Sequence, residues 1–451
     1  MKGRQILLAG LLIAGGLATS IGSRAAVRQE RDVCAAQPTP ALNPDLPSDV
    51  CIPGGFSGIA VEYFDDYSWR AFVSLVWPAA APQRGVASRT SPLTTPGPRV
   101  FETYKPLWEI FHRDGSAPET AFARYDAGTH APCDGSPRFG DLIIGSHSGI
   151  ADIGQGGIGA LDPPLVAQNG RYVRTLTFFN QIAFDHIIAE RLYLRSALPP
   201  VPSPRPDTPV VDFPIGSVAV KTAWIDITGL PPAMVARLYT RPVTLRNATD
   251  SGCAPATMGL VGMHIAQKTP SRPQWIWSSF EHEHLVPPAW PGSPGSFVLH
   301  DGTAAPMPAN NPLSLVPLAP EPVRPFNVVR DPGAPILTRT DLTNYAYQAL
   351  LADTPWRNYR VVVTQWPRLE GNQADPIPAS VDGSVANTFP GTGAFSAFAN
   401  LTMETFNQNS PQVGCMSCHN RARMTADFMW SVLDHAYPAR LAPAPERIGA
   451  R

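Results

Sequence analysis

Proline is spread along this whole chain, and it limits the folds that the chain can adopt. There are 51 prolines among 451 residues, more than a tenth of the sequence. A proline inside a helix removes a backbone donor and clashes with the preceding turn, so a bundle of long helices is disfavoured. The same residue favours strands joined by irregular loops. The distribution therefore predicts a β-rich protein.

Three consecutive segments have the alternation and the β-branched or aromatic content of strands. They are residues 217–228, 257–268 and 274–282. A turn at 270–273 separates the last two, and together the three predict an antiparallel sheet. Residues 359–366 predict a further strand. We expect an α+β protein with a β-rich body.

Several shorter segments have apolar residues at helical spacing. Residues 64–78 predict an amphipathic helix that ends at Pro78. Asn180 follows a strand-like segment and is expected to cap a helix that continues to about residue 194. Further helices are predicted over residues 100–111 (broken by Pro106), 342–351, 397–407 and 427–436.

Near its C-terminus the chain carries Cys415, Cys418 and His419 in the order Cys-x-x-Cys-His. This is the attachment pattern of a c-type haem, in which two thiols bond the porphyrin and the adjacent imidazole binds the iron. A redox dithiol or a zinc site also uses Cys-x-x-Cys. The position near the C-terminus disfavours a redox dithiol. A zinc site is disfavoured because His435 is the only further candidate ligand after the motif. We predict one covalent haem c, with His419 as the proximal ligand.

The first 25 residues have the features of a secretory signal peptide. Two basic residues precede an apolar run at 6–18, and small residues allow cleavage after Ser20 or Ala25. An uncleaved anchor is the alternative. No later apolar run has the length of a membrane span. We expect a periplasmic or secreted protein with no transmembrane span after cleavage. Covalent haem attachment of this kind is expected outside the bacterial cytoplasm.

The chain has six cysteines, of which the haem motif uses two. The other four are expected to form two disulfides in an oxidising compartment. Three pairings are possible, and buried thiols are the alternative. Cys34 and Cys51 flank a short proline-rich loop, so we predict that they pair with each other and that Cys133 pairs with Cys253.

The predicted organisation is a signal peptide (1–25), a β-rich body (26–335) and a helical haem c region (336–451), and the last two are allowed to form one compact unit. The net charge of −1 provides no basic surface for nucleic acid. The oligomeric state is not predicted.

The motif does not specify the residue on the second side of the iron. Small cytochromes c often use a methionine there. Met424 and Met429 follow the motif too closely to loop easily to the other haem face, and His435 is similar. His282 and His284, which share a face at the end of a strand, are alternatives.

The strand over 257–268 offers a more specific candidate. Strict alternation places Leu260, Gly262 and His264 on one side and Met263 on the other. Glycine leaves room for a flat macrocycle to approach the backbone. We therefore predict His264 on the distal side, as the sixth ligand or as a hydrogen-bond donor to a bound ligand, with Met263 as its rival.

Long phrases of the sequence also resemble a family of exported bacterial cytochrome c family proteins with one Cys-x-x-Cys-His motif near the C-terminus. They include YSWRAFVSLVWP, GLVGMHIAQKTPSRPQWIWSSFEH, WRNYRVVVTQWP and CMSCH. The resemblance spans roughly residues 63–437. It implies haem attachment at Cys415 and Cys418 and iron ligation at His419, and it implies no catalytic residue.

Three functions remain open from the sequence. The first is electron transfer to a redox partner protein. The second is a haem-dependent oxidoreductase that uses peroxide or oxygen and acts on a small-molecule substrate. The third is a haem-based ligand-binding or sensor protein. A body this large around one haem favours a role that involves a substrate. Trp275, Trp277 and Trp366 are expected to line a pocket, to relay electrons or to belong to the core.

Overall fold

Residues Cys34–Arg451 form one compact unit in the computed structural model. The predicted signal peptide lies outside the described residues, as do Cys34, Cys133 and Cys418. In the part of the chain that is described, no helix has the length and apolar character needed to cross a membrane. The described residues are 38–52, 61–126, 138–145, 164–199, 211–246, 253–288, 297–303, 321–366, 399–408, 415, 419 and 422–438.

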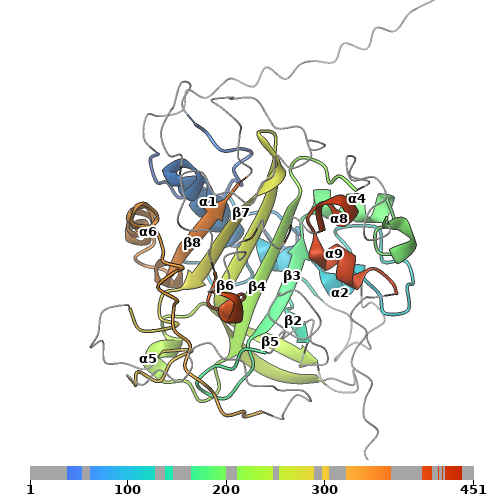
Figure 1. The fold of residues 1–451 in the computed structure, drawn as a ribbon. Helices are drawn as coiled ribbons and strands as arrows, with labels where there is room; N and C mark the ends of the chain where they lie inside the picture. Colours follow the sequence, from blue (N-terminus) through green and yellow to red (C-terminus); the bar gives the residue numbers. More distant parts are fainter. Residues whose placement is uncertain are drawn as a thin grey trace, which may run out of the picture. The chain divides into compact units, whose positions relative to one another are not determined.

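The described strands form one curled sheet (Figure 1). The strands are β1 Lys105–Pro106, β2 Ile143–Gly145, β3 Arg174–Phe179, β4 Val218–Asp226, β5 Thr240–Arg246, β6 Cys253–Thr269, β7 Arg272–His282 and β8 Tyr359–Gln365. Their order is β1-β3-β4-β6-β5-β2, and β7 joins β6 to β8. All of these pairs are antiparallel except β2 with β5.

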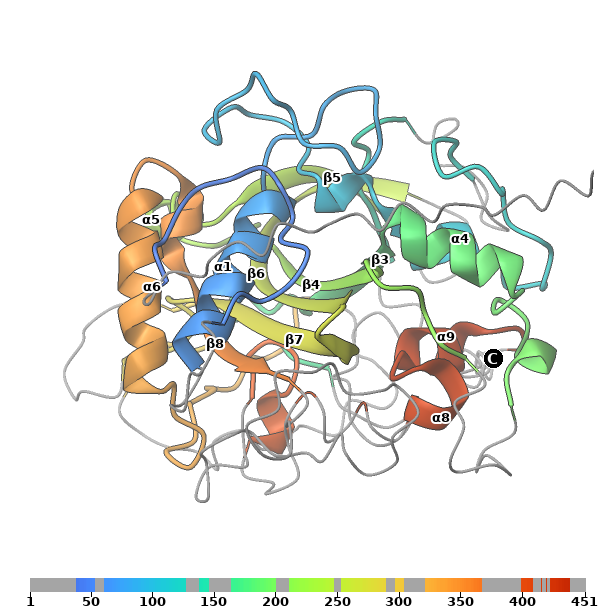
Figure 2. The ribbon, with the colours of Figure 1, turned by 90° about the horizontal axis from the view of Figure 1, so that it is seen from above.

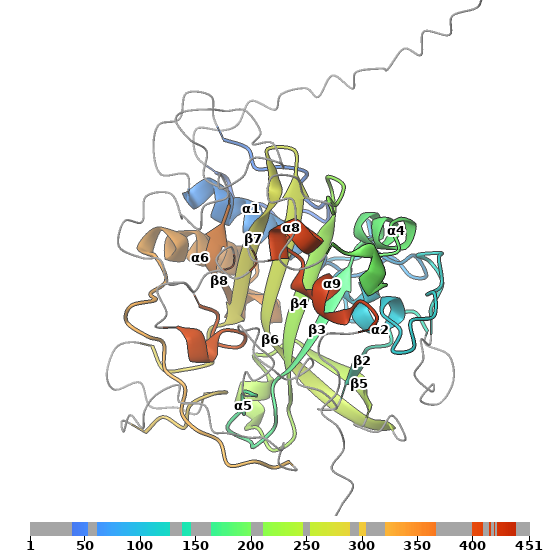
Figure 3. The same ribbon diagram turned by 45° about the vertical axis from the view of Figure 1, so that its right-hand side comes forward.

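The sheet confirms the four strands predicted from the sequence, which are β4, β6, β7 and β8. β8 belongs to the predicted haem region and pairs along β7 of the predicted body (Figure 3). One sheet therefore extends through both predicted regions.

Short helices cover both sides of the sheet. They are α1 Val61–Leu75, α2 Leu107–Ile110, α4 Gln181–Ala189, α5 Pro232–Val235, α6 Thr338–Leu350, α8 Arg423–Ala426 and α9 Trp430–His435. Figure 2 shows α1 and α6 on one side and α8 and α9 on the other. The predicted cap is confirmed at α4, where the Asn180 side chain accepts a hydrogen bond from the backbone N–H of Ala183 at 3.1 Å.

Aromatic contacts hold α1 and α6 against their side of the sheet. Phe72 of α1 stacks on Phe280 of β7 with ring centroids 4.4 Å apart. Trp69 packs edge-on against Phe280 at 5.1 Å and stacks on Tyr347 of α6 at 5.1 Å. The proposed haem motif lies on the opposite side of the sheet from this core. Its His419 packs on Trp277, which pairs with Ala266 of β6, whereas Phe280 pairs with Met263 in the same unbroken register and so faces the other way.

Four of the predicted helices are wrong or shorter than expected. The helix capped by Asn180 ends at Ala189 and not near residue 194. Residues 100–111 form a single turn of 3-10 helix, the strand β1 and the four-residue α2. Residues 399–408 are mostly turns, because the Asn400 side chain accepts from the Thr402 N–H at 2.9 Å and donates to the Phe280 carbonyl at 2.7 Å. The last helix begins only at Trp430, after two residues with left-handed backbone.

A β-bulge in β6 changes which side chains share a face. Ala223 of β4 pairs with Gly262 and the next residue, Trp224, pairs with Leu260, so Val261 is an extra residue. Leu260 and Met263 consequently lie in the same core cluster. The prediction that Leu260 shares the side of Gly262 was wrong, because strict alternation does not hold across a bulge.

Candidate functional site

The His419 side chain is held by a backbone carbonyl. Its Nδ1 lies 2.6 Å from the carbonyl oxygen of Phe428. A carbonyl oxygen can only accept, so Nδ1 carries the proton of the neutral ring and Nε2 keeps its lone pair. Burial, with smaller contributions from His264 and Lys221, lowers the pKa of His419 to about 4. The ring is therefore neutral at pH 7, which is the state that binds a metal.

A strained turn places this carbonyl. Asp427 and Phe428 have φ values of 45° and 72°, in the left-handed region that side chains rarely adopt. The Asp427 carboxylate fixes the turn, since it accepts from the Lys268 ammonium at 2.6 Å and from the Phe213 N–H at 2.8 Å. Burial raises the pKa of Asp427 to about 6 despite the Lys268 charge. The turn thus links His419 to β6 through Lys268.

Trp277 of β7 packs against the His419 ring. The two ring centroids are 4.2 Å apart and the planes are inclined by 40°. Trp275 contacts Phe213 and Trp277, and Trp366 stacks on Phe64 of α1. Of the three tryptophans singled out in the sequence, Trp277 is therefore the one with a ring contact to the haem motif among the described residues. Cys415 is partly buried and packs against the main core.

His264 lies on the same side of the sheet as Trp277. It pairs with Lys221 of β4 and Ser279 of β7. Its charge, like that of Lys221, acts on His419 and lowers the pKa of that ring. The structure therefore brings the two sequence-predicted histidines, His419 and His264, to one side of the sheet.

Glu404 is a part of this site that the sequence did not indicate. Its Oε1 lies 3.5 Å from Nε2 of His264. That nitrogen is buried and has no hydrogen-bond partner among the described residues. Burial alone would raise the pKa of Glu404, but His264 and the Asn400 N–H lower it, and the net effect is a lowering. Glu404 is therefore ionised at neutral pH beside the imidazole.

Gly262 explains how Glu404 reaches His264. A Cβ atom on Gly262 would lie 2.1 Å from Oγ1 of Thr402. The space that we expected to admit a macrocycle is thus filled by Thr402, so this reason for placing His264 at the haem does not hold. The glycine instead lets residues 399–408 approach β6, which carries Glu404 to the imidazole.

Three other candidates for the second axial position are engaged elsewhere: His282, Met263 and Met429. His282 uses both ring nitrogens: Nε2 lies 3.1 Å from the Arg237 carbonyl, and Nδ1 accepts from the N–H of His284 at 3.2 Å. Burial lowers the pKa of His282 to about 3. Met263 and Met429 lie in the main core, and the Met424 side chain lies outside the described residues.

The described residues include only some of the cysteines on which the disulfide and haem predictions depend. Cys51 and Cys253 each take part in a disulfide. The predicted pairings stay predictions, because Cys34 and Cys133 lie outside the described residues. Within the described ranges, no group of three or more His, Cys, Asp or Glu side chains could hold a metal ion. Cys418 lies outside those ranges, so this finding does not test haem attachment.

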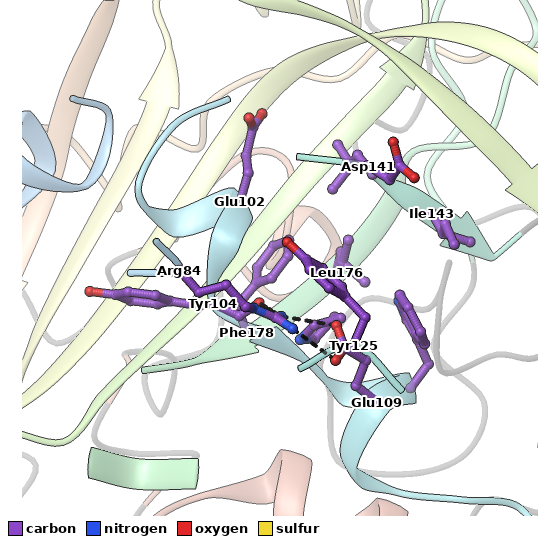
Figure 4. Close-up of a pocket in the computed structure, with 12 residues that line it drawn as sticks. Arg84, Glu102, Tyr104, Glu109, Tyr125, Asp141, Ile143, Leu176 and Phe178 are labelled. Atoms are coloured by element: carbon purple, nitrogen blue, oxygen red, sulfur yellow. Dashed lines mark hydrogen bonds and ion pairs between the residues drawn. The ribbon is translucent and has the colours of Figure 1, made fainter. Parts of the chain in front are cut away.

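A second polar cluster lies at a small cavity beside β1 (Figure 4). Arg84 forms two bonds to the carboxylate of Glu109, at 2.9 and 3.0 Å, and Lys105 donates to the same group at 2.8 Å. The cavity has a volume of about 10 Å³, room for about one water molecule. Because the Glu109 carboxylate is already bound by both cations in a space this small, we assign the cluster a structural role.

Comparisons with known proteins do not assign the chain to a group. No family model matches it, and neither the curated proteins nor the solved structures contain a match.

Proposed function

We propose that the chain is an exported c-type cytochrome with one covalent haem, attached through Cys415 and Cys418 and bound at the iron by His419. The observation that supports this most is the state of His419. The imidazole is neutral at pH 7, its proton lies on Nδ1 and is donated to the Phe428 carbonyl, and Nε2 is left as the basic nitrogen. A histidine that binds a metal typically has its other nitrogen held in this way, which fixes the tautomer and strengthens the ligand.

The side chains at this site are of the types that would hold a haem c. Cys415 provides a thiol, His419 an imidazole, and Trp277 an aromatic wall. When bound, the haem iron supplies one-electron redox chemistry. The protein's own residues hold the ligand ring, keep its proton on Nδ1 and exclude water from one side of it. The reaction partner is a redox protein or a small molecule.

Expression in a strain that matures c-type cytochromes tests this proposal. We expect the denatured protein to retain haem after extraction with acidified acetone, with a mass increase of one haem. Cys418→Ala should weaken or abolish attachment. His419→Ala should change the absorption spectrum while the thioether bonds persist. Complete loss of haem on extraction from the native chain would overturn the proposal.

A haem-dependent oxidoreductase is a second candidate, and the His264–Glu404 pair favours it. An imidazole next to a carboxylate can accept and donate protons in reactions of peroxide or oxygen, and pure electron transfer requires no such pair. A haem-based sensor would also use it, to hold a bound ligand. The ferrous spectrum with and without carbon monoxide separates these candidates from electron transfer, because only an accessible iron binds the gas.

A further inference from the structure

Two contacts of different kinds hold the His419 ring. The hydrogen bond from Nδ1 to the Phe428 carbonyl fixes the direction of one ring atom, and it leaves the ring free to turn about that bond. The Trp277 indole lies against the ring with centroids 4.2 Å apart, which restricts this turning. The two contacts together define the plane of the imidazole.

Trp277 is itself held firmly. It is 5% exposed and sits in a central part of the sheet, where it pairs with Ala266 of β6 and Gln365 of β8. Its Nε1 donates to the Gln274 carbonyl at 3.3 Å, and its ring packs edge-on against Phe428 at 6.4 Å. The indole therefore touches both the His419 ring and the residue that binds His419 Nδ1.

We propose that Trp277 is a positioning residue for the iron ligand: it fixes the plane of the His419 imidazole and stabilises the oxidised state of the bound haem. This inference rests on the proposed function. The plane of an axial imidazole sets how its orbitals overlap with those of the iron, and groups around a ligand tune its donor strength.

The effect on the redox equilibrium follows from the charge of the indole face. That face is negative, and it attracts electron-poor groups. An imidazole bound to ferric iron is more electron-poor than one bound to ferrous iron. The contact with Trp277 is therefore stronger in the oxidised protein, and it lowers the reduction potential. Loss of the indole should raise that potential.

Matched tryptophan substitutions test the proposal in the full-length holoprotein. Trp277→Leu removes the aromatic face, and Trp277→Phe keeps a smaller one. Trp366→Phe is the control, because Trp366 is buried and stacks on Phe64 of α1, on the side of the sheet away from His419. The readouts are the ferric electron paramagnetic resonance spectrum and the reduction potential measured by spectroelectrochemistry.

We expect Trp277→Leu to raise the potential and to shift or broaden the ferric resonance. Trp277→Phe should produce a smaller shift in the same direction, which keeps the test available if the leucine variant does not fold. Trp366→Phe should change neither readout. Equal shifts in the two phenylalanine variants, or no shift in either Trp277 variant, would overturn the inference while haem attachment stands. Absence of covalent haem from the unmodified chain would overturn the proposed function itself.

Discussion

His264 shows how one neighbouring side chain separates two possible roles for a residue. The sequence places it on the side of the sheet opposite Met263, and the structure confirms this. A sixth ligand would most simply use Nε2, but that nitrogen faces the Glu404 carboxylate at 3.5 Å. A carboxylate holds a proton on the imidazole nitrogen that faces it and competes with the iron for that nitrogen. The geometry therefore favours a hydrogen-bonding role for His264.

We predict that His264→Ala leaves the spin state of the ferric haem unchanged. It should slow the reaction with hydrogen peroxide by about 10²-fold, the usual contribution of a general acid–base residue. Glu404→Gln keeps the shape of the side chain next to His264, and it should slow the reaction less than His264→Ala does. Stopped-flow absorption measures the rates. Conversion of a low-spin haem to a high-spin haem in His264→Ala would show that His264 is a ligand instead.

Residue-level prediction from sequence succeeded where the information is local. The opposite orientation of His264 and Met263 can be read from adjacent residues, and the register of β6 confirms it. The haem motif is local as well, and haem attachment stays a prediction. The position of Glu404 cannot, because Thr402 and Glu404 reach β6 only through long-range packing on Gly262. A small residue inside a strand was the available signal, but sequence alone did not show what fills the space beside it.

The strands could be predicted from the sequence more accurately than the helices, because long-range contacts changed the local structure of several predicted helices. Strands β4, β6, β7 and β8 have a strong periodicity of two residues, and the sheet preserves it except at a few register shifts such as the bulge at Val261. The segments 397–407 and 427–436 have helical spacing, but distant partners override it. Lys268 holds Asp427 in the left-handed turn, and the Phe280 carbonyl holds the Asn400 side chain.

Residues 399–408 are attached to the sheet through Glu281 of β7. This fully buried carboxylate binds Arg330 at 2.5 Å and Arg360 at 2.9 Å, and it accepts from the Leu401 N–H at 3.2 Å. Arg330 in turn donates to the Ala399 carbonyl at 3.1 Å. Although burial opposes ionisation, the two guanidinium groups lower the pKa of Glu281 overall.

We predict that Glu281→Gln lowers the free energy of unfolding by about 3–5 kcal/mol, because it leaves two partly buried arginines without their counter-charge. Urea denaturation monitored by tryptophan fluorescence measures this. Since the folded pKa of Glu281 is lowered, its contribution is complete above the unfolded pKa and is lost as the pH falls through the folded value. Asp45→Asn, at an exposed ion pair with Arg89, is the control and should have no measurable effect. Equal stability of Glu281→Gln and the native protein would show that the Glu281 charge does not stabilise the fold through Arg330 and Arg360.

At the scale of the whole molecule, a buried carboxylate connects three elements on the side of the sheet away from His419. Asp65 of α1 accepts from the Thr340 hydroxyl of α6 and from the Thr364 hydroxyl of β8, both at 2.7 Å. Burial raises the pKa of Asp65 to about 7, and the hydroxyl groups offset only part of that rise. The packing of α1 and α6 on the sheet is therefore sensitive to pH.

The sign of this sensitivity follows from proton linkage. Between the ordinary carboxyl pKa near 4 and the folded value of about 7, the folded protein holds a proton on Asp65 that the unfolded chain has lost. The contribution of Asp65 to stability is therefore complete below about pH 4 and is lost as the pH rises to 7. A shift of this size corresponds to at most about 4 kcal/mol.

We predict that Asp65→Asn abolishes this decline, because the amide stays neutral and the two threonine hydroxyls can still bind it. The variant should gain stability relative to the native protein as the pH rises from 4 to 7, and the difference should level off above that range. Urea titrations at a series of pH values measure the difference. Asp114→Asn, an exposed carboxylate whose pKa is lowered by Ser116, is the control and should follow the native curve over this range. Parallel curves for Asp65→Asn and the native protein would mean that Asp65 is ionised in both states, and that the contact between α1, α6 and β8 does not depend on its proton.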